Sequence, residues 1–300
     1  MLARRDFLFA TAAGLTLAAL PAHARSDAAR ADPDARLRAL ESGAARLGVC
    51  FLDTRNGEVR GNRLDERFAF CSTFKLAMVA ACLREADHGR LDLDEVLRYG
   101  KDDLLEWAPV TGEHVAQGGL PIRELARAAQ TLSDGTAANL LVRRLGGPAA
   151  VTAKFREMGD TVTRLDRYEP DLGLVLSADL RDTTTPRAMA ELVRRITTGE
   201  LLQPTSRALL LDWMITTQTG AHRLRAGTPE GWRIGNKTGT GRTEGTTNKV
   251  NDVAIVFPPE QNPIVIAAYY DSGVYTAQTE RAHEDVLAEV ARIASDWALR

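Results

Sequence analysis

A serine and a lysine three positions apart open a long apolar stretch of the chain. They are Ser72 and Lys75, and the sequence continues as LAMVAACL. Residues three apart lie on the same face of a helix, so the lysine ammonium can reach the serine hydroxyl. A buried ammonium is costly unless it is paired, so a cation inside an apolar helix calls for a chemical reason. The pair predicts a nucleophilic serine that is activated by a lysine.

Two more short motifs follow along the chain. Serine and lysine at this spacing often occur by chance, so the pair alone does not establish a catalytic site. Ser133 lies in the segment SDG between two predicted helices, where a second hydroxyl can stand at the edge of a cleft. KTGT, residues 237–240, lies on a predicted strand, where Lys237 can attract a carboxylate and Gly239 would let a ligand approach the backbone. Three motifs in this order resemble those of the serine enzymes that recognise penicillin.

A long loop narrows this resemblance to one family. The segment RLDRYEPDLG, residues 164–173, resembles the Ω-loop signature of class A β-lactamases, in which the glutamate before the proline positions a hydrolytic water. FAFCSTFK and TAANLL are also similar to this family, and the resemblance covers essentially the whole chain after residue 24. The sequence thus resembles a class A serine β-lactamase. Such an enzyme hydrolyses the β-lactam amide bond of penicillins and cephalosporins and gives antibiotic resistance.

The resemblance implies a role for each matching residue. Ser72 would attack the lactam carbonyl to form an acyl-enzyme, and Lys75 would shuttle its proton. Ser133 would pass a proton to the lactam nitrogen, and Glu169 would be the base for deacylation through a water. The backbone N–H groups of Ser72 and Thr240 would form the oxyanion hole. Whether the lysine or the glutamate is the base for acylation stays open.

Substrate binding is implied in the same way. Lys237, Thr238 and Thr240 would hold the substrate carboxylate. Arg223 matches an arginine that some members use for this carboxylate, whereas others use an arginine on the next strand, where this chain has Thr246. The alternative reading of Arg223 is an ordinary surface arginine.

Three further positions concern the shape of the cleft. Trp107 matches an aromatic residue at the cleft entrance, although a half-buried packing tryptophan is an equally open reading. Gly135 stands where the family usually has the asparagine of its S-D-N motif, which would hold the substrate's acylamide carbonyl and steady Lys75. Gly173, four residues after Glu169, replaces an asparagine that helps to anchor the hydrolytic water. We expect both glycines to enlarge the cleft, Gly135 to lower the affinity for acylamino side chains, and Gly173 to slow deacylation.

The loop itself contains an expected anchor. Arg167 and Asp182 match an ion pair that ties the Ω loop together in the family, whereas a solvated surface pair would contribute little. The bond between Glu169 and Pro170 is a candidate cis peptide. An unanchored loop would misplace the water, so we favour the structural role for the pair.

The cysteines predict no obligatory disulfide. Their number is odd, and Cys71 and Cys82 lie eleven positions apart on one predicted helix, too far along its axis for a bond. Cys71 precedes the nucleophile as in carbapenem-hydrolysing members of the family, but Gly241 and Arg242 offer it no partner cysteine. This leaves the carbapenem question open.

The first residues predict export. Residues 1–24 contain the pair Arg4 and Arg5, then an apolar run, and then a small-residue site that ends at Ala24. We interpret them as a cleaved twin-arginine signal peptide. An uncleaved membrane anchor is the alternative, but the apolar run is short for a bilayer. We therefore expect a periplasmic or secreted protein without stable membrane association after cleavage.

The order of the elements predicts the fold. Helical patterns fill much of residues 71–214, whereas strand patterns lie at 46–53, 58–62, 232–240, 250–257 and 263–270. Asn56-Gly57 predicts a two-residue hairpin turn, and a final helix covers 279–299. We predict an α+β fold, an antiparallel five-stranded sheet flanked by N- and C-terminal helices. Residues 25–70 and 215–300 would form the α/β domain, and 71–214 an inserted all-α domain that includes the Ω loop, 164–182.

Charge and composition limit the partners. The 38 basic and 40 acidic residues nearly balance, so we expect no nucleic acid partner. The five histidines show no ligand spacing, and we expect neither a metal nor an organic cofactor. We expect a monomer that binds a small β-lactam.

Other functional classes remain as alternatives. A penicillin-binding DD-peptidase shares the three motifs but normally lacks a loop with a residue like Glu169. A non-catalytic β-lactam sensor domain would be acylated once and read by a membrane partner, and the cleavable signal argues against it. A solute-binding export protein would leave Ser72, Lys75 and Glu169 without a joint purpose.

Overall fold

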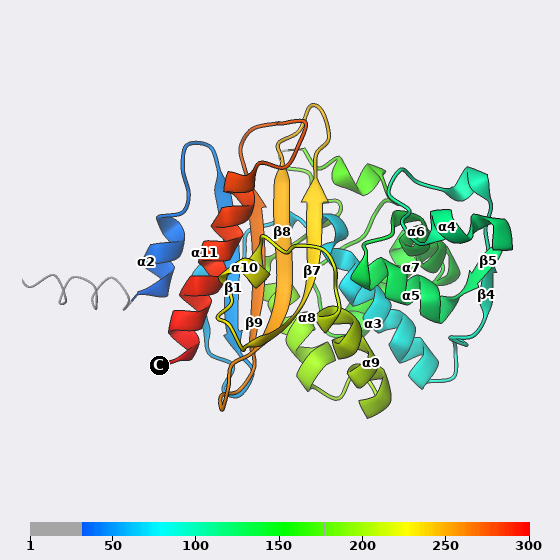
Figure 1. The fold of residues 1–300 in the computed structure, drawn as a ribbon, viewed down its shortest axis with the longest axis horizontal. Helices are drawn as coiled ribbons and strands as arrows, with labels where there is room; N and C mark the ends of the chain where they lie inside the picture. The colour runs from blue at the N-terminus through cyan, green and yellow to red at the C-terminus, as the bar shows by residue number, and fades with distance from the viewer. Residues whose placement is uncertain (1–31, 177) are drawn as a thin grey trace, which may run out of the picture. The chain divides into compact units, whose positions relative to one another are not determined.

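A five-stranded sheet forms the centre of the chain (Figure 1). The computed structural model describes residues 32–176 and 178–300, so the expected signal peptide, residues 1–24, lies outside the described residues. Every neighbouring pair of strands in this sheet is antiparallel. The spatial order is β2-β1-β9-β8-β7, with bounds Arg46–Asp53 for β1, Val59–Asn62 for β2, Arg233–Gly241 for β7, Lys249–Phe257 for β8 and Ile264–Asp271 for β9.

The two ends of the chain meet in this sheet. Strand β1 pairs along its whole length with β9, from Arg46 opposite Asp271 to Asp53 opposite Ile264. Strands β8 and β9 are buried over nearly all their residues, because helices cover both faces of the sheet. This explains why β9 and the second half of β8, residues 253–257, are continuously apolar over most of their length rather than alternating.

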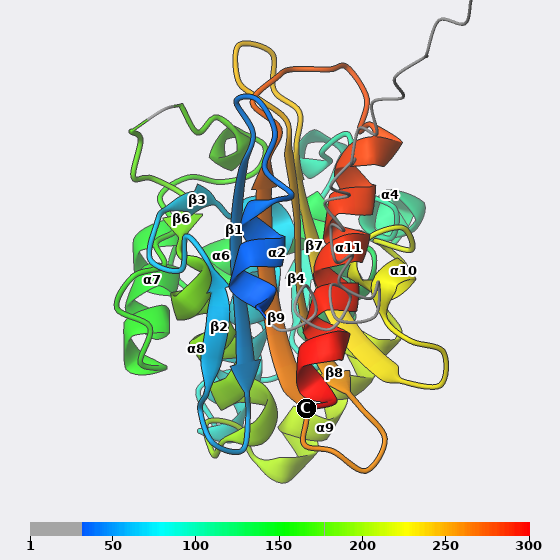
Figure 2. The same ribbon diagram turned by 90° about the vertical axis from the view of Figure 1, so that its left-hand side faces the viewer.

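Helices from both ends of the chain cover one face. Helix α11, Arg281–Ala298, packs on β1, β8 and β9, and the short helices α2, Pro33–Arg38, and α10, Leu224–Gly227, pack against it (Figure 2). The core between them includes Leu47 of β1 and Trp297 of α11. This layer is apolar on its inner side because α11 has an amphipathic sequence.

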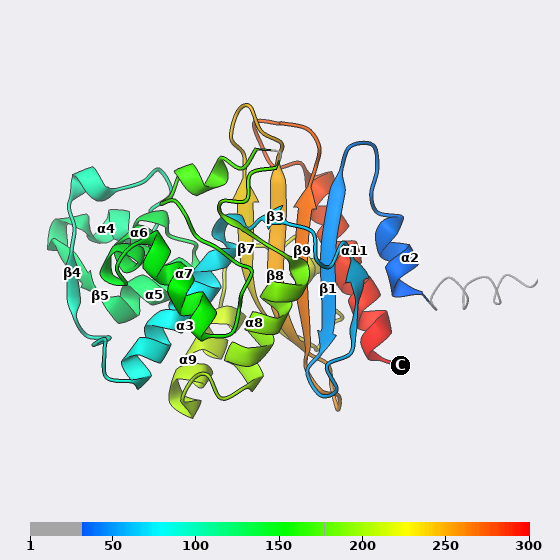
Figure 3. The same cartoon turned by 180° about the vertical axis from the view of Figure 1, so that it is seen from behind.

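The helices of the middle of the chain lie on the other side (Figure 3). Helix α8, Pro186–Thr198, packs on the sheet, and α9, Pro204–Ile215, packs on β7. Helix α3, Phe74–Asp87, is buried and contacts the helices around it, which is why its sequence is apolar on every side. Those helices are α5, Ile122–Thr131, α6, Gly135–Arg144, and α7, Pro148–Glu157, together with α8 and α9.

Short elements complete the connections between these layers. Two-residue strands β3 and β6 pair with each other, as do β4 and β5. Their bounds are Phe68–Ala69 for β3, Val96–Arg98 for β4, Gly119–Pro121 for β5 and Thr183–Thr184 for β6, and helix α4 is Thr111–His114. The 3-10 turns are η1, Cys71–Thr73, η2, Lys101–Asp103, η3, Val115–Gln117, and η4, Asp171–Gly173.

The predicted α+β fold with its five-stranded antiparallel sheet is confirmed, with three local differences. Ser72 lies in the 3-10 turn η1 rather than in the long helix, which begins at Phe74. The first hairpin has a wider loop than two residues, because Asp53 N donates to Glu58 O across Asn56 and Gly57. Thr246 was expected on a strand but lies in the turn between β7 and β8.

Residues Pro33–Arg300 form one compact unit by their contacts. The finer division into an α/β domain and an inserted all-α domain stays a prediction. Among the described residues, no helix is both long and apolar enough to cross a membrane.

Candidate active site

A cavity of about 640 Å³ brings most of the predicted site residues together. Its wall is built by the η1 turn, the start of α3, the loop before α6, the Ω loop (residues 164–182) and strand β7. The predicted residues that line it are Ser72, Lys75, Trp107, Ser133, Gly135, Glu169, Arg223, Thr238 and Thr240. Lys237 reaches the same place through its ammonium, as described below, whereas Gly173 is not among the lining residues.

The η1 turn holds Ser72 against the edge strand β7. The side-chain amide of Asn251 on β8 donates to Ala69 O and Phe70 O, at 2.9 and 3.2 Å, just before the turn. A Cβ on Gly239 would lie 2.6 Å from Phe70 O, so the strand approaches the turn closely only because this residue is glycine. We predicted this space for a ligand; the protein's own backbone uses it, and Ser72 and Thr240 thereby line one cavity.

Glu169 bridges the serine and the lysine. Ser72 Oγ donates to Glu169 Oε1 at 3.1 Å, and Lys75 Nζ lies 3.0 Å from the same oxygen. The predicted activation of the serine therefore involves a third group. The serine and the lysine both contact a carboxylate of the Ω loop that lies 97 residues from Ser72 in sequence. One oxygen can accept the serine proton while the lysine balances its charge.

Two ammonium groups converge on Ser133. Lys75 Nζ donates to Ser133 O at 2.8 Å and to its Oγ at 3.4 Å, and Lys237 Nζ donates to the same Oγ at 2.9 Å. The backbone of Ser133 is left-handed, with φ of 60°, which is uncommon outside glycine and turns its hydroxyl into the cavity between the lysines. Donors on both sides make this hydroxyl well placed to relay a proton.

Burial and charge act together on the pKa values of the site. Burial alone would raise the pKa of Glu169, but the charge and hydrogen bond of Lys75, with the Ser72 hydroxyl, bring it below its ordinary value. Burial, followed by repulsion from Lys75, holds the pKa of Lys237 well below that of a free lysine. The carboxylate is thus kept ionised, and Lys237 can release a proton more readily than an exposed lysine.

A buried arginine lies at the far end of the cavity. Arg223 is buried, and it donates to Thr240 Oγ1 at 2.8 Å and to the backbone oxygens of Gly239 and Asn251. Glu284 of α11 accepts from its Nε at 3.0 Å and fixes the guanidinium. This burial excludes the reading of Arg223 as an ordinary surface arginine.

Trp107 stands at the rim of the cavity. Its side chain is 60% exposed, which excludes the half-buried packing role, and its Nε1 donates to Leu132 O at 2.9 Å.

Gly135 lies beside Trp107, at the start of α6. A Cβ on Gly135 would lie 3.1 Å from Leu105 Cδ1 and 3.3 Å from Trp107 O, so the space of the missing side chain is partly taken by Leu105.

The Ω loop is tied down from within. Arg167 Nε donates to Asp182 Oδ2 at 2.5 Å, and the fully buried Asp182 also accepts from the backbone N–H of Arg167. The Glu169-Pro170 bond is cis. Gly173 is not among the lining residues, and a Cβ there would lie 3.3 Å from Thr243 Oγ1.

Asn139 is a positioning residue that sequence reasoning missed. Its side-chain amide donates to Glu169 O at 2.9 Å, and its Oδ1 accepts from Glu169 N at 3.0 Å, so both polar ends hold the backbone of Glu169. A polar residue on the buried face of α6 was the only signal in the sequence, and it does not name its partner. Asp134, which caps α6 by accepting from Ala137 N, was missed for the same reason.

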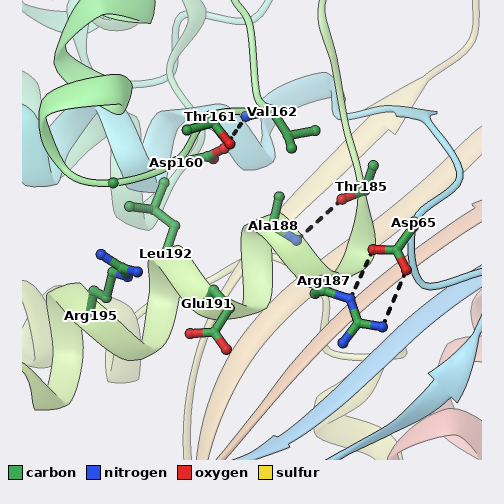
Figure 4. Close-up of a pocket in the computed structure, with 11 residues that line it drawn as sticks. Asp65, Asp160, Thr161, Val162, Thr185, Arg187, Ala188, Glu191, Leu192 and Arg195 are labelled. Carbon is green, nitrogen blue, oxygen red and sulfur yellow. Dashed lines mark hydrogen bonds and ion pairs between the residues drawn. The ribbon is translucent and has the colours of Figure 1, made fainter. Parts of the chain in front are cut away.

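The other pockets and clusters do not compete with this site. A smaller cavity of about 180 Å³ lies beside α8, where Asp65 is paired with Arg187 and only Asp160, Glu191 and Arg195 add charge (Figure 4). It contains none of the predicted site residues. In the part of the chain that the structure describes, no cluster of three or more acidic, histidine or cysteine side chains could hold a metal ion.

Comparison with known proteins agrees with this geometry. A model of the β-lactamase enzyme family matches residues 32–298. β-Lactamase L2 of Stenotrophomonas maltophilia is 44% identical over 98% of each chain, and a β-lactamase of Amycolatopsis lactamdurans is 44% identical over 83% of this chain and 80% of its own. Among solved structures, an ancestral (GNCA) class A β-lactamase is 46% identical, covers 89% of this chain and 100% of its own, and superposes with a TM-score of 0.83.

These similarities extend over nearly the whole described chain. The chain therefore belongs to the β-lactamase enzyme family, as a class A serine β-lactamase.

Proposed function

We propose that the protein hydrolyses the amide bond of penicillins and cephalosporins through an acyl-enzyme on Ser72, and so gives antibiotic resistance. The observation that carries this proposal is the shared oxygen of Glu169, within 3.1 Å of Ser72 Oγ and 3.0 Å of Lys75 Nζ inside one cavity. A nucleophile, a base and a compensating cation are then in contact before substrate arrives.

Acylation begins with the serine proton. As Ser72 Oγ bonds to the lactam carbonyl carbon, its proton passes to Glu169, which already accepts that hydrogen bond. The C–N bond then breaks, and Ser133 donates its proton to the leaving nitrogen. Lys75 contacts both Ser133 and Glu169, so its ammonium can resupply the Ser133 proton and then take the proton that Glu169 received, which returns Glu169 to its carboxylate form. Lys237 also contacts the Ser133 hydroxyl and supports its position.

The negative charge that develops on the carbonyl oxygen needs donors. We assign them to the backbone N–H groups of Ser72 and Thr240, which belong to the two elements that Gly239 brings together. A hydrogen bond to an oxyanion is stronger than one to a neutral carbonyl, so these donors favour the transition state over the bound substrate.

Deacylation uses the same base on a water molecule. Glu169 takes a proton from the water as the water oxygen attacks the ester carbonyl, and the proton returns to Ser72 Oγ when the ester bond breaks. Asn139 and the Arg167–Asp182 pair support this step by holding the loop that carries the base.

Substrate carboxylate recognition falls to the cationic end of the cavity. Lys237, Thr238 and Thr240 present their polar groups there, and Arg223 orients Thr240 from behind. Arg223 therefore acts on the carboxylate by its charge and through the threonine hydroxyl that it holds.

The N-terminal sequence indicates the cellular compartment in which the enzyme would act. A twin-arginine signal in residues 1–24 supports export to the periplasm or beyond. β-Lactams act outside the cytoplasmic membrane, so an exported hydrolase would meet them before their targets.

The test follows turnover and the acyl-enzyme mass with a penicillin and a chromogenic cephalosporin, in the unmodified protein and in Glu169→Ala. We expect multiple turnover in the first and a stable adduct on Ser72 in the second. A stable adduct without turnover in the unmodified protein would instead identify a penicillin-binding protein or a sensor. Lys101→Met, an exposed change outside the cavity, is the control and should leave turnover unchanged.

A further inference from the structure

A second cavity, of about 650 Å³, lies at one end of the sheet. Its floor includes the first residues of β1 and β8, Arg46 and Lys249, and the last residue of β9, Asp271, which pairs with both across the sheet. Strand β3 and part of the Ω loop form its walls. Among the described residues, none lines both this cavity and the candidate active site, although the two have similar volumes.

The cavity contains two cations that lack an acidic partner. Lys249 is only 5% exposed, and its Nζ donates to Thr247 O and Thr247 Oγ1, at 2.6 and 2.9 Å. Arg67 donates to Thr183 Oγ1 and Val162 O, at 2.9 and 3.2 Å. Within the described part of the chain, no carboxylate oxygen lies within 4.0 Å of either cation. A charged group as buried as Lys249 is normally paired, so the arrangement leaves room for an anion.

The acidic residues at the cavity are already engaged. Asp271 accepts hydrogen bonds from the Thr247 hydroxyl and from Gly273 N. Both donors are neutral, so Asp271 keeps its charge and offsets one of the two unpaired positive charges. Asp179 forms ion pairs with Arg181 at 2.9 Å and Arg167 at 3.9 Å. The third cation of the lining, Arg46, is paired with a glutamate outside the cavity. The lining as a whole therefore carries more free positive than free negative charge.

Apolar groups lie beside these cations. Phe68 is buried with its ring under the guanidinium of Arg46, 4.6 Å from its centroid. Ala69 and Val175 pack with Cys71 in a small apolar cluster that is separate from the two large cores. A cavity with cations and apolar side chains in its lining suits a ligand with one anionic group on an apolar body.

We propose that this cavity is a second ligand site, specific for organic carboxylates of compact apolar body, with the carboxylate at Lys249 and the body against Phe68 and Val175. Lys249 supplies a charge-assisted hydrogen bond in a poorly solvated place, where such a bond is strongest. Neutral analogues of the same shape lack this contact and leave the ammonium unpaired.

Occupancy of the second site should affect the first. Ala69 stands three residues before Ser72, and Val175 lies in the loop that carries Glu169. A ligand in the cavity contacts both segments, and so acts on the supports of the nucleophile and of the base together. This consequence rests on the proposed function, whereas binding itself does not.

The test is a nuclear magnetic resonance titration of the full chain with 4-phenylbutyrate. Backbone amides of Thr247, Lys249 and Gly273 report on the second cavity, and those of Gly220 and Thr240 report on the candidate active site. We expect saturable shifts at the first group, at least about tenfold weaker binding in Lys249→Met, and a similar loss for the neutral analogue 4-phenylbutan-1-ol.

A control variant and three opposing results complete the titration. Lys101→Met removes an exposed lysine that lines neither cavity, and should bind like the unmodified protein. Shifts confined to Gly220 and Thr240, no saturable shifts, or equal affinity for the alcohol would each overturn the second site. If Lys249→Met does not fold, two other measurements test the site. They are the affinity of Arg67→Gln for 4-phenylbutyrate and the comparison of the acid with the alcohol in the unmodified protein.

A turnover assay separates the two proposals. Hydrolysis of a chromogenic cephalosporin should slow as 4-phenylbutyrate fills the second cavity, and this effect should weaken in Lys249→Met. Binding at the second cavity without any change in turnover would overturn the coupling alone. A protein that binds 4-phenylbutyrate there but hydrolyses no β-lactam would overturn the proposed function and leave the site standing.

Discussion

At Glu169 two opposing effects act on one carboxyl group. Burial favours its neutral form, whereas Lys75 at 3.0 Å and the Ser72 hydroxyl favour the carboxylate. The net result is a pKa below the ordinary value of 4.5, so the residue is a base throughout the neutral range. The same lysine therefore keeps the base ionised and contacts the hydroxyl of Ser133.

This balance predicts how the site titrates. The carbon-13 shift of the Glu169 carboxyl should give a pKa below 4.5, because the lysine outweighs burial. Lys75→Met should raise that pKa, since only the Ser72 hydroxyl and the charge of Lys237 then oppose burial. Glu169→Gln identifies the resonance, and Lys101→Met should leave it unmoved. A value above 4.5 in the unmodified protein would show that burial prevails.

Loss of the Asn139 side chain should slow deacylation as much as loss of a residue that touches the substrate. Asn139→Ala removes both hydrogen bonds to the Glu169 backbone, so the base loses its position. We expect deacylation to slow about 100-fold while acyl-enzyme accumulates, as a misplaced catalytic group commonly costs. Rapid-quench mass spectrometry of the adduct measures this. The idea fails if acylation and deacylation fall equally along with the melting temperature, because that pattern marks a general loss of structure.

At the scale of elements, the contact between β7 and the η1 turn sets the distance between Thr240 and Ser72, the two proposed oxyanion donors. Gly239 lies on an extended strand, and its missing side chain is what lets the strand reach Phe70 and Thr73. The Ω loop contributes the base to the same cavity, held by the buried Asp182. The η1 turn, the Ω loop and strand β7 are far apart in sequence. Tertiary contacts must therefore fix the distances between them.

Gly239→Ala tests this spacing. Its Cβ would lie 2.6 Å from Phe70 O, so the strand or the turn must move, at a cost of about 1–3 kcal/mol of unfolding free energy. We expect the acylation rate to fall more than this loss of stability would suggest, because the oxyanion donors separate. Gly100→Ala is the matched control, since nothing lies within 4 Å of a Cβ there and its φ is −133°. Equal acylation rates in both variants would refute the spacing argument.

For the molecule as a whole, the sheet joins the two ends of the chain. Strand β1 pairs with β9 and packs under α11, where Phe51 stacks on Trp297 with centroids 6.0 Å apart. Helices from the middle of the chain cover the opposite face of the same sheet. Loss of β1 should therefore expose both cores rather than one.

We predict a single cooperative unfolding transition, with one midpoint in circular dichroism and in tryptophan fluorescence. Leu47→Ala on β1, fully buried in the core under α11, should lower stability by about 2–5 kcal/mol and move both signals together. Leu299→Ala, at a position 63% exposed, should change little. Two separate transitions would instead support an inserted helical domain that unfolds alone.

The sequence by itself determined the chemistry of this protein. Ser72, Lys75, Ser133, Glu169 and Lys237 can be read from short motifs, because catalysis requires particular functional groups at spacings that local helix, loop and strand geometry sets. The strands and the longer helices follow from apolar periodicity for a similar reason: burial acts on every residue of an element. Family, fold and the main candidate residues were therefore predictable.

Tertiary structure decided which groups meet. Glu169 rather than Lys75 accepts the Ser72 hydroxyl, Asn139 holds the Glu169 backbone, and Gly239 makes room for protein backbone rather than for a ligand. Gly173 is not among the residues that line the cavity. Each of these contacts joins residues far apart in the chain, and their distance depends on how all the intervening elements pack. No local pattern contains that information.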